Sequence, residues 1–423
     1  MEKHLNIVQI NEGIISCSAP NRLHYALKKV GLSTQIITTR ASYESPFVNV
    51  VNKDFLCKVF GKIDYILYKT EFLRKYKVKE GMPFSYYRAG MNLSKHPLVK
   101  NADIIELHWV CGSFLSVRGI KKILQLKKPV IIVCHDNWFF TGGCHVRMGC
   151  EKYKTHCAAC PQLTSEKERD CSYRLFRQKI KVFQKGNITV VSPSRWMDQN
   201  VASSKLLKNK PHYVIPNSLS PELFKPWNRS VIRQEYGIEE QDIVLAYGAV
   251  NATKVPYKGY EQLLSALEMF KKQYTGNRHI VILVFGSKKE EVQTNFGFEI
   301  RYLGYLEEIE MVKLYSCTDV YIVPSLEDSF NYTVAESLAC ETPVVSFATG
   351  GIVDIIEHKE NGYLAEYNNP ADLANGIAWV LENNSDNCLG KAGRTKVVNN
   401  YSEEIVAKQF LELYKRLMEN GNE

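Results

Sequence analysis

The sequence has no hydrophobic run long enough to cross a membrane. Its longest apolar runs, such as residues 280–285, fall far short of the roughly 20 residues that a bilayer requires. The four residues before the first strand-like run, 5–10, do not resemble a secretion signal. Without an export signal, twelve cysteines do not indicate a disulfide framework, and we expect a cytoplasmic protein whose cysteines are mostly small core residues.

Glycine is scarce where a phosphate-binding fold often has a cluster of it. In the turn after the first strand-like run, residues 11–20, the single glycine is Gly13. We therefore predict no phosphate cradle there. The sequence also has no recognised nucleic-acid-binding motif and no obvious catalytic nucleophile.

Charge is divided unevenly along the chain. Residues 1–215 contain 35 Lys and Arg against 15 Asp and Glu, whereas residues 216–423 contain 19 against 30, which together give the net charge of +9. A basic first half favours an anionic partner: a lipid surface, a phosphorylated acceptor or nucleic acid. The alternative is a basic surface that only keeps the protein in solution.

Strand-like and helix-like patterns alternate through both halves, which predicts α/β domains with parallel, doubly wound sheets. We predict a domain over residues 1–215 and a second over 216–400, because the segment from 216 to 227 is weakly periodic and the alternation restarts at 243–247. Residues 401–423 contain an amphipathic helix, 403–418, that needs a surface to cover.

Residues 320–340 read as strand, polar loop and helix, with the helix beginning near Tyr332. Asp328 in the loop and Glu336 in the helix flank a helix N-terminus, whose N–H groups favour an anion. Lys258 lies in an earlier loop and could meet a diphosphate from the other side. The alternative is that Ser329 or Asn331 only caps the helix and that Glu336 is solvated.

Two histidines follow strand-like runs of the first half. His108 comes after residues 104–107 and His135 after residues 130–134, and each precedes a tryptophan. In open α/β sheets, ligands bind beyond the carboxyl ends of the strands. Both histidines are therefore candidate ligand contacts, although a histidine at a strand end is more often structural.

The loop 141–163 contains four cysteines, Cys144, Cys150, Cys157 and Cys160, and few apolar residues. In a reduced protein, a structural zinc site with four thiolate ligands would fix such a loop, and His145 or His156 could replace one ligand. The spacing differs from a double Cys-x-x-Cys, so loosely packed or redox-linked cysteines are the alternative.

Residues 57–79 are basic and aromatic and could form an amphipathic helix. Such a helix could lie on an anionic membrane. The alternative is that it packs on its own domain.

These features together resemble the retaining glycosyltransferases of family 4. The strongest matches are residues 324–345, followed by Gly350-Gly351 and Asn361-Gly362, and the run that begins at His135. The second run is similar to a bacterial subgroup that builds surface polysaccharides. The resemblance covers nearly the whole chain and implies two Rossmann-like domains that face each other across a cleft, the GT-B fold, with the C-terminal helix crossing back to the first domain.

The resemblance also implies roles for individual residues. Asp328, where the family usually has Glu, would face the sugar and the reaction centre, and Glu336 would hold the ribose. Lys258 would bind the diphosphate, with Lys254 in place of a second basic residue that the family often has. His135 would lie near the transferred sugar. The diphosphate would also meet the start of the helix, at Ser329, Phe330, Asn331 and Thr333.

We therefore expect an enzyme that moves a sugar from a UDP- or GDP-sugar to a saccharide or polyprenyl-diphosphate-linked acceptor at the inner face of the cytoplasmic membrane. It would need no cofactor for catalysis and would bind no nucleic acid. Two other hypotheses stay open on the sequence alone: a non-catalytic protein that binds an anionic polymer or nucleic acid, and a nucleotide-sugar epimerase or phosphorylase on the same fold.

Overall fold

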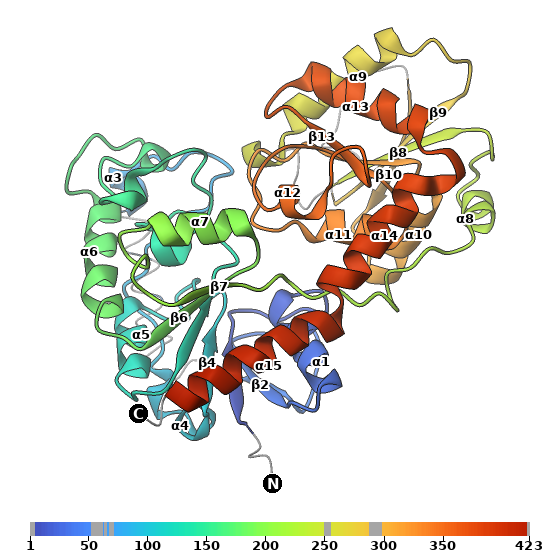
Figure 1. The fold of residues 1–423 in the computed structure, drawn as a ribbon. Coiled ribbons are helices and arrows are strands. Elements are labelled where there is room, and N and C mark those ends of the chain that lie inside the picture. The colour runs from blue at the N-terminus through green and yellow to red at the C-terminus, as the bar shows by residue number, and fades with distance from the viewer. Residues whose placement is uncertain are drawn as a thin grey trace. The chain divides into compact units, whose positions relative to one another are not determined.

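The computed structural model describes residues 5–51, 62, 66, 72–248, 255–286 and 298–420. The chain divides into two compact units (Figure 1). Unit 1 comprises residues 1–218 and 403–423, and unit 2 comprises residues 219–402. The two units are described separately below.

Unit 1 is built on a parallel sheet of seven strands in the order β3-β2-β1-β4-β5-β6-β7. The strands are β1 (Ile7–Ile10), β2 (Thr34–Thr38), β3 (Val48–Val50), β4 (Ile104–Leu107), β5 (Val130–Val133), β6 (Ile188–Ser192) and β7 (His212–Val214). Its helices are α1 (Ala19–Lys29), α3 (Leu73–Lys75), α4 (Pro97–Asn101), α5 (Val117–Leu124), α6 (Cys171–Phe183), α7 (Arg195–Ser203) and α15 (Glu403–Asn420).

Unit 2 has a parallel sheet of six strands in the order β10-β9-β8-β11-β12-β13. The strands are β8 (Ile243–Gly248), β9 (Ile280–Phe285), β10 (Glu299–Gly304), β11 (Val320–Val323), β12 (Val344–Phe347) and β13 (Gly362–Ala365). Its helices are α8 (Arg229–Glu235), α9 (Tyr260–Gln273), α10 (Glu308–Cys317), α11 (Tyr332–Ala339), α12 (Ile352–Ile355), α13 (Pro370–Asn383) and α14 (Cys388–Tyr401).

Both sheets bury both faces. Along β8, Val244 and Ala246 pack into one hydrophobic cluster, whereas Leu245 and Tyr247 pack into another on the opposite face. Successive side chains of a strand alternate between faces, so a sheet covered on both sides has strands that read as continuous apolar runs. This is why the strands could be located from sequence, and the predicted α/β fold with two doubly wound parallel sheets is confirmed.

In both units the strand order reverses direction beside the first strand. The reversal falls between β1 and β4 in unit 1 and between β8 and β11 in unit 2. In doubly wound sheets, ligands bind outside the carboxyl ends of the strands at this point. His108 follows β4, and the loop that contains Asp328 follows β11.

The C-terminal helix α15 belongs to unit 1, although all of unit 2 precedes it in the chain. It runs beside α1 (Figure 1), and its apolar face covers the sheet. Val406, Phe410 and Tyr414 of α15 are buried in one cluster with Leu23 of α1 and Ile104 of β4.

The basic segment predicted at residues 57–79 lies largely outside the described residues, so its proposed contact with a membrane stays a prediction. Among the helices of the described chain, none is long and apolar enough to cross a membrane.

Replacing Phe410 by alanine tests whether α15 is part of the unit 1 core. The side chain is 3 % exposed, so Phe410→Ala should destabilise unit 1 by about 3–5 kcal/mol. Lys408→Ala on the same helix removes only a solvent-exposed ion pair with Glu404, and we expect it to cost less than about 0.5 kcal/mol. Chemical denaturation of both variants measures the difference; equal midpoints for Phe410→Ala and wild type would contradict the packing role.

Candidate active site

The loop after β11 leads directly into helix α11, as predicted. Asn331 is the N-cap residue, with a left-handed backbone (φ 70°), and its side-chain oxygen accepts a hydrogen bond from the Val334 N–H at 3.1 Å. Asparagine tolerates this backbone region better than most residues. The same side chain donates to Oδ2 of Asp328 at 3.1 Å. Asn331 therefore joins the helix N-terminus to the candidate acid.

Lys258 lies against this acid. Its Nζ is 2.9 Å from Oδ2 of Asp328, and the two side chains are 24 % and 13 % exposed. Burial by itself lowers the pKa of Lys258, but the Asp328 carboxylate outweighs burial, and the net pKa is raised above the ordinary value. A cation, a carboxylate and the N-terminus of α11 thus meet at one point of unit 2.

Backbone contacts fix the loop from two sides. On one side, the Leu326 N–H donates to the Tyr257 carbonyl at 2.8 Å, and a Cβ at Gly259 would come within 1.8 Å of the Pro324 carbonyl oxygen. On the other side, the Gly351 N–H donates to the Asp328 carbonyl at 2.9 Å, and a Cβ at Gly350 would come within 2.0 Å of the same oxygen. Glycine at 259 and 350 lets three loops pack backbone to backbone.

Glu336 is not a solvated helix residue. It is 6 % exposed, and its carboxylate accepts a hydrogen bond from the Tyr315 hydroxyl at 3.3 Å. Burial, and then the nearby Glu336 charge, raises the pKa of Tyr315 well above its usual value, so the phenol stays a donor.

The other predicted ligand contacts of unit 2 differ in exposure. Ser329 and Thr333 are half-buried, whereas Phe330 is buried in the core beside Tyr401. The Phe330 side chain therefore stabilises the loop, and only its backbone could meet a ligand. Lys254 lies outside the described residues, and its role stays a prediction.

In unit 1, the two candidate histidines are in contact. Nδ1 of His108 is 2.9 Å from Nε2 of His135, and the rings stack with centroids 5.2 Å apart. His108 is buried, whereas His135 is half-buried at the end of the strand. Burial, and then His108, lowers the pKa of His135 to about 3, so its ring is neutral at neutral pH.

A second polar cluster lies beside His135 and was not predicted. Nδ1 of His145 is 2.6 Å from Oδ2 of Asp136, and Nε2 is 2.7 Å from Oγ of Ser85. Burial alone would raise the pKa of Asp136, but His145 and the Trp138 N–H lower it below its ordinary value. Ser85 is 7 % exposed, which does not suit a nucleophile. The cluster holds the loop after β5 against residue 85, a contact that sequence spacing cannot reveal.

The structure does not arrange the predicted zinc ligands as a metal site. Across the parts of the chain that the structure describes, which include all of loop 141–163, no group of three or more His, Cys, Asp or Glu side chains could hold a metal ion. Both ring nitrogens of His145 are hydrogen-bonded, one to Asp136 and the other to Ser85. Cys144 and Cys160 pack in an apolar cluster with Phe84.

In the metal-free loop, burial favours the protonated thiol form of these cysteines. Burial raises the pKa of Cys157 to about 12 and that of Cys160 to about 11, and it raises the pKa of Cys144 as well. Cys157 accepts a hydrogen bond from the Gly142 N–H at 3.1 Å. The alternative drawn from sequence was loosely packed or redox-linked cysteines, whereas Cys144, Cys157 and Cys160 are buried.

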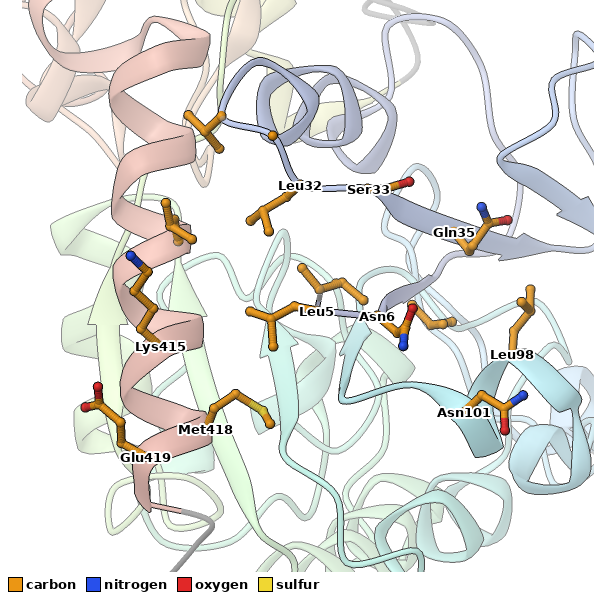
Figure 2. Close-up of a pocket in the computed structure, with 15 residues that line it drawn as sticks. Leu5, Asn6, Leu32, Ser33, Gln35, Leu98, Asn101, Lys415, Met418 and Glu419 are labelled. Carbon is orange, nitrogen blue, oxygen red and sulfur yellow. The ribbon is translucent and has the colours of Figure 1, made fainter. Parts of the chain in front are cut away.

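Unit 1 also contains a cavity of about 750 Å³ at the opposite edge of its sheet. Figure 2 shows Leu5 and Asn6, which precede β1, with Lys415 and Met418 of α15 on one side and Leu98 of α4 on the other. It opens at the amino ends of β1 and β2, away from the edge where ligands of doubly wound sheets bind. We therefore do not assign it to the active site.

The part of unit 2 that contains these features matches the model of a known protein family. Residues 228–396 match the glycosyl transferases group 1 family, and this range contains Lys258, Asp328 and Glu336. The chain is a glycosyltransferase. Enzymes of this group, family 4 with the GT-B fold, transfer a sugar from a nucleotide-sugar donor and typically need no cofactor. The predicted enzyme class is confirmed.

Similar sequences agree with this assignment. An uncharacterized glycosyltransferase of Methanocaldococcus jannaschii is 22 % identical over 368 residues, which covers 81 % of this chain and 92 % of that protein. A D-inositol 3-phosphate glycosyltransferase of Nocardioides is 25 % identical over 214 residues, 46 % of each chain. The match thus spans about half the length of the second relative.

Solved structures share the fold. Sucrose-phosphate synthase of Thermosynechococcus elongatus has a TM-score of 0.67 at 17 % identity, over 98 % of this chain and 100 % of that chain. HepE of Anabaena, in complex with UDP and glucose, has a TM-score of 0.64 at 15 % identity, with the same coverage. At these identities the likeness establishes the fold alone.

Gly259 offers a test of the backbone packing around Asp328. Gly259→Ala should destabilise unit 2, because the added Cβ meets the Pro324 carbonyl in addition to the strain of a positive φ (71°). Gly237 is the matched control in the same unit, since it has φ 60° and nothing within 4 Å of its Cβ position. Gly237→Ala should cost only about 1–2 kcal/mol. Thermal unfolding compares the two; a smaller loss for Gly259→Ala than for Gly237→Ala would contradict the packing.

The low pKa of His135 predicts a pH dependence. Native His135 stays neutral down to about pH 3, whereas the unfolded ring takes up a proton below about pH 6.5. Its contribution to stability is therefore complete above pH 6.5 and declines as the pH falls toward 3. We expect the His135 ring signal not to titrate between pH 8 and 5 in NMR. We also expect the unfolding midpoint of His135→Asn to fall less over this range than that of wild type; a ring midpoint near 6.5 would contradict the assignment.

Proposed function

We propose that the protein transfers a sugar from a nucleoside-diphosphate sugar to a saccharide or a lipid-linked saccharide, with retention of the anomeric configuration, in cell-surface polysaccharide synthesis. Unit 2 would bind the donor, and unit 1 would supply the acceptor side. We place the enzyme at the inner face of the cytoplasmic membrane.

The observation that carries this proposal is the meeting of Lys258, Asp328 and the N-terminus of α11 where the strand order of unit 2 reverses. A diphosphate is favoured by a helix N-terminus and by a lysine, and both can stabilise the charge that develops on it as it leaves. Lys258 needs little reorganisation for this task, because Asp328 already holds it in the loop.

Asp328 and Glu336 would bind the other two parts of the donor, the sugar and the ribose. Asp328 accepts from Lys258 and Asn331 and is 13 % exposed, so its remaining lone pairs can accept from sugar hydroxyls. Glu336, one turn inside α11 and fixed by Tyr315, would accept from the ribose hydroxyls. A pair of hydroxyls suits a carboxylate, which offers two acceptor oxygens.

UDP is the first nucleotide to test, because HepE, which shares the fold, was solved with UDP-glucose as well as with UDP and glucose. For the acceptor, the excess of Lys and Arg in residues 1–215 suits an anionic molecule such as a polyprenyl diphosphate. Anionic lipid at the membrane surface would attract the same charge.

We propose front-face substitution for the chemistry. The bond between the anomeric carbon and the diphosphate oxygen breaks, the acceptor oxygen bonds to that carbon on the same face, and the acceptor proton passes to the departing phosphate. This route requires no enzyme nucleophile, and the residues gathered at the site include donors and acceptors rather than an activated nucleophile.

Two acidic variants test the assignment. Glu336→Gln should weaken binding of the nucleoside diphosphate by about tenfold or more, because the buried ribose contact loses its charge. Asp328→Asn should reduce the transfer rate by about 100-fold and weaken binding of the nucleotide less than Glu336→Gln does. Isothermal titration with UDP and GDP measures the first effect, and labelled-sugar transfer to an acceptor measures the second.

Glu382→Ala is the control, since Glu382 is an exposed acid of α13 in the same unit. Wild-type transfer by both site variants would refute the site. Conversion of the nucleotide sugar without an acceptor would indicate an epimerase instead.

A further inference from the structure

Glu106 of β4 is a carboxylate in the fully buried centre of unit 1, with an exposure of 0 %. Its Oε1 accepts from the Tyr414 hydroxyl of α15 at 2.7 Å. Its Oε2 accepts from the Gln9 side-chain amide at 3.1 Å and lies 3.4 Å from Nε2 of His108. The phenol O–H of Tyr414 and the amide N–H of Gln9 are donors, so both carboxylate oxygens of Glu106 act as acceptors.

This arrangement decides which nitrogen of His108 bears a proton. Nε2 faces an acceptor oxygen and therefore carries the hydrogen. A neutral imidazole has one donor and one acceptor, so Nδ1 of His108 is an acceptor.

The tautomer of His108 in turn fixes the tautomer of His135. Its Nε2 lies 2.9 Å from the acceptor Nδ1 of His108, so this Nε2 carries the hydrogen. Nδ1 of His135 then bears the lone pair, and no hydrogen bond to it is found within the described chain. Of the hydrogen-bonded residues Glu106, His108 and His135, it is His135 that reaches the carboxyl edge of the sheet, where it is half-buried.

We propose that Glu106 and His108 are positioning residues that fix His135 as the tautomer with its proton on Nε2, so that Nδ1 accepts a hydrogen bond from a hydroxyl of the transferred sugar. The inference rests on the proposed function and on the resemblance to family 4, which implies that His135 lies near the transferred sugar. A fixed acceptor favours donors with a hydroxyl at that position over deoxy sugars, because the site does not have to reorganise to receive the hydroxyl proton.

The tautomer can be measured without any enzyme assay. In the full-length protein labelled with ¹⁵N in its histidine rings, we expect the His135 Nδ1 signal to have the shift of an unprotonated nitrogen, with His135→Asn providing the assignment. Glu106→Gln replaces one acceptor oxygen by an N–H donor, so His135 molecules with a proton on Nδ1 should appear. Tyr414→Phe is the control: it removes a donor to the same carboxylate but keeps the charge, and His135 should keep its tautomer.

The kinetic test follows the same variants. Glu106→Gln should lower the rate of transfer at saturating donor by about tenfold and leave the affinity for UDP or GDP unchanged, because the lost interaction is one hydrogen bond to the sugar. A purely structural role for Glu106 would lower the unfolding midpoint without this change in tautomer.

The outcomes separate this inference from the proposed function. A wild-type His135 with its proton on Nδ1, or a Glu106→Gln variant with unchanged tautomer and rate, overturns the positioning role. If the tautomers behave as expected but His135→Asn transfers sugar at the wild-type rate, then His135 does not contact the sugar and the inference fails, whereas the proposed function, which rests on Lys258, Asp328 and Glu336, stands.

Discussion

The candidate donor site depends on two carbonyl oxygens that leave no space for a neighbouring side chain. Pro324 and Asp328 present their carbonyls to Gly259 and Gly350, where any Cβ would come within about 2 Å. Because these contacts are between backbones, the loop that carries Asp328 cannot shift independently of the segments before α9 and α12. Lys258 stands one residue from the first contact, and so its ammonium group reaches Asp328.

The same segment also shows what sequence can predict. The strand β11, the helix α11 and the acids on either side of its N-terminus follow from periodicity and capping, which are local. The contact between Lys258 and Asp328 joins residues 70 positions apart and was not predicted; the sequence suggested only that both lie near a diphosphate-binding helix N-terminus. That Glu336 is buried against Tyr315 was not predicted, since burial depends on what α10 places opposite it.

The side-chain contacts of unit 1 were less predictable from sequence, because they join residues that lie far apart in the chain. His108 and His135 were singled out because each follows a strand, but nothing local reveals that their rings touch. Glu106 is one polar residue in an apolar strand, and its partner Tyr414 is 308 residues away. The cysteine loop differs in another respect. The spacing of its cysteines suggested shared metal ligands, whereas Cys144 and Cys160 are buried in a small apolar cluster.

A buried carboxylate would be a costly way to stabilise β4, because burying a charge is repaid only by complete hydrogen bonding. Here three donors surround Glu106, and one of them comes from the last helix of the chain. An apolar residue at position 106 would pack the sheet at lower cost, but it would leave His108 without an acceptor and so leave its tautomer undetermined. The charge is better explained by the orientation of the histidine pair than by stability, and α15 then contributes to the candidate site through Tyr414 as well as covering the core of unit 1.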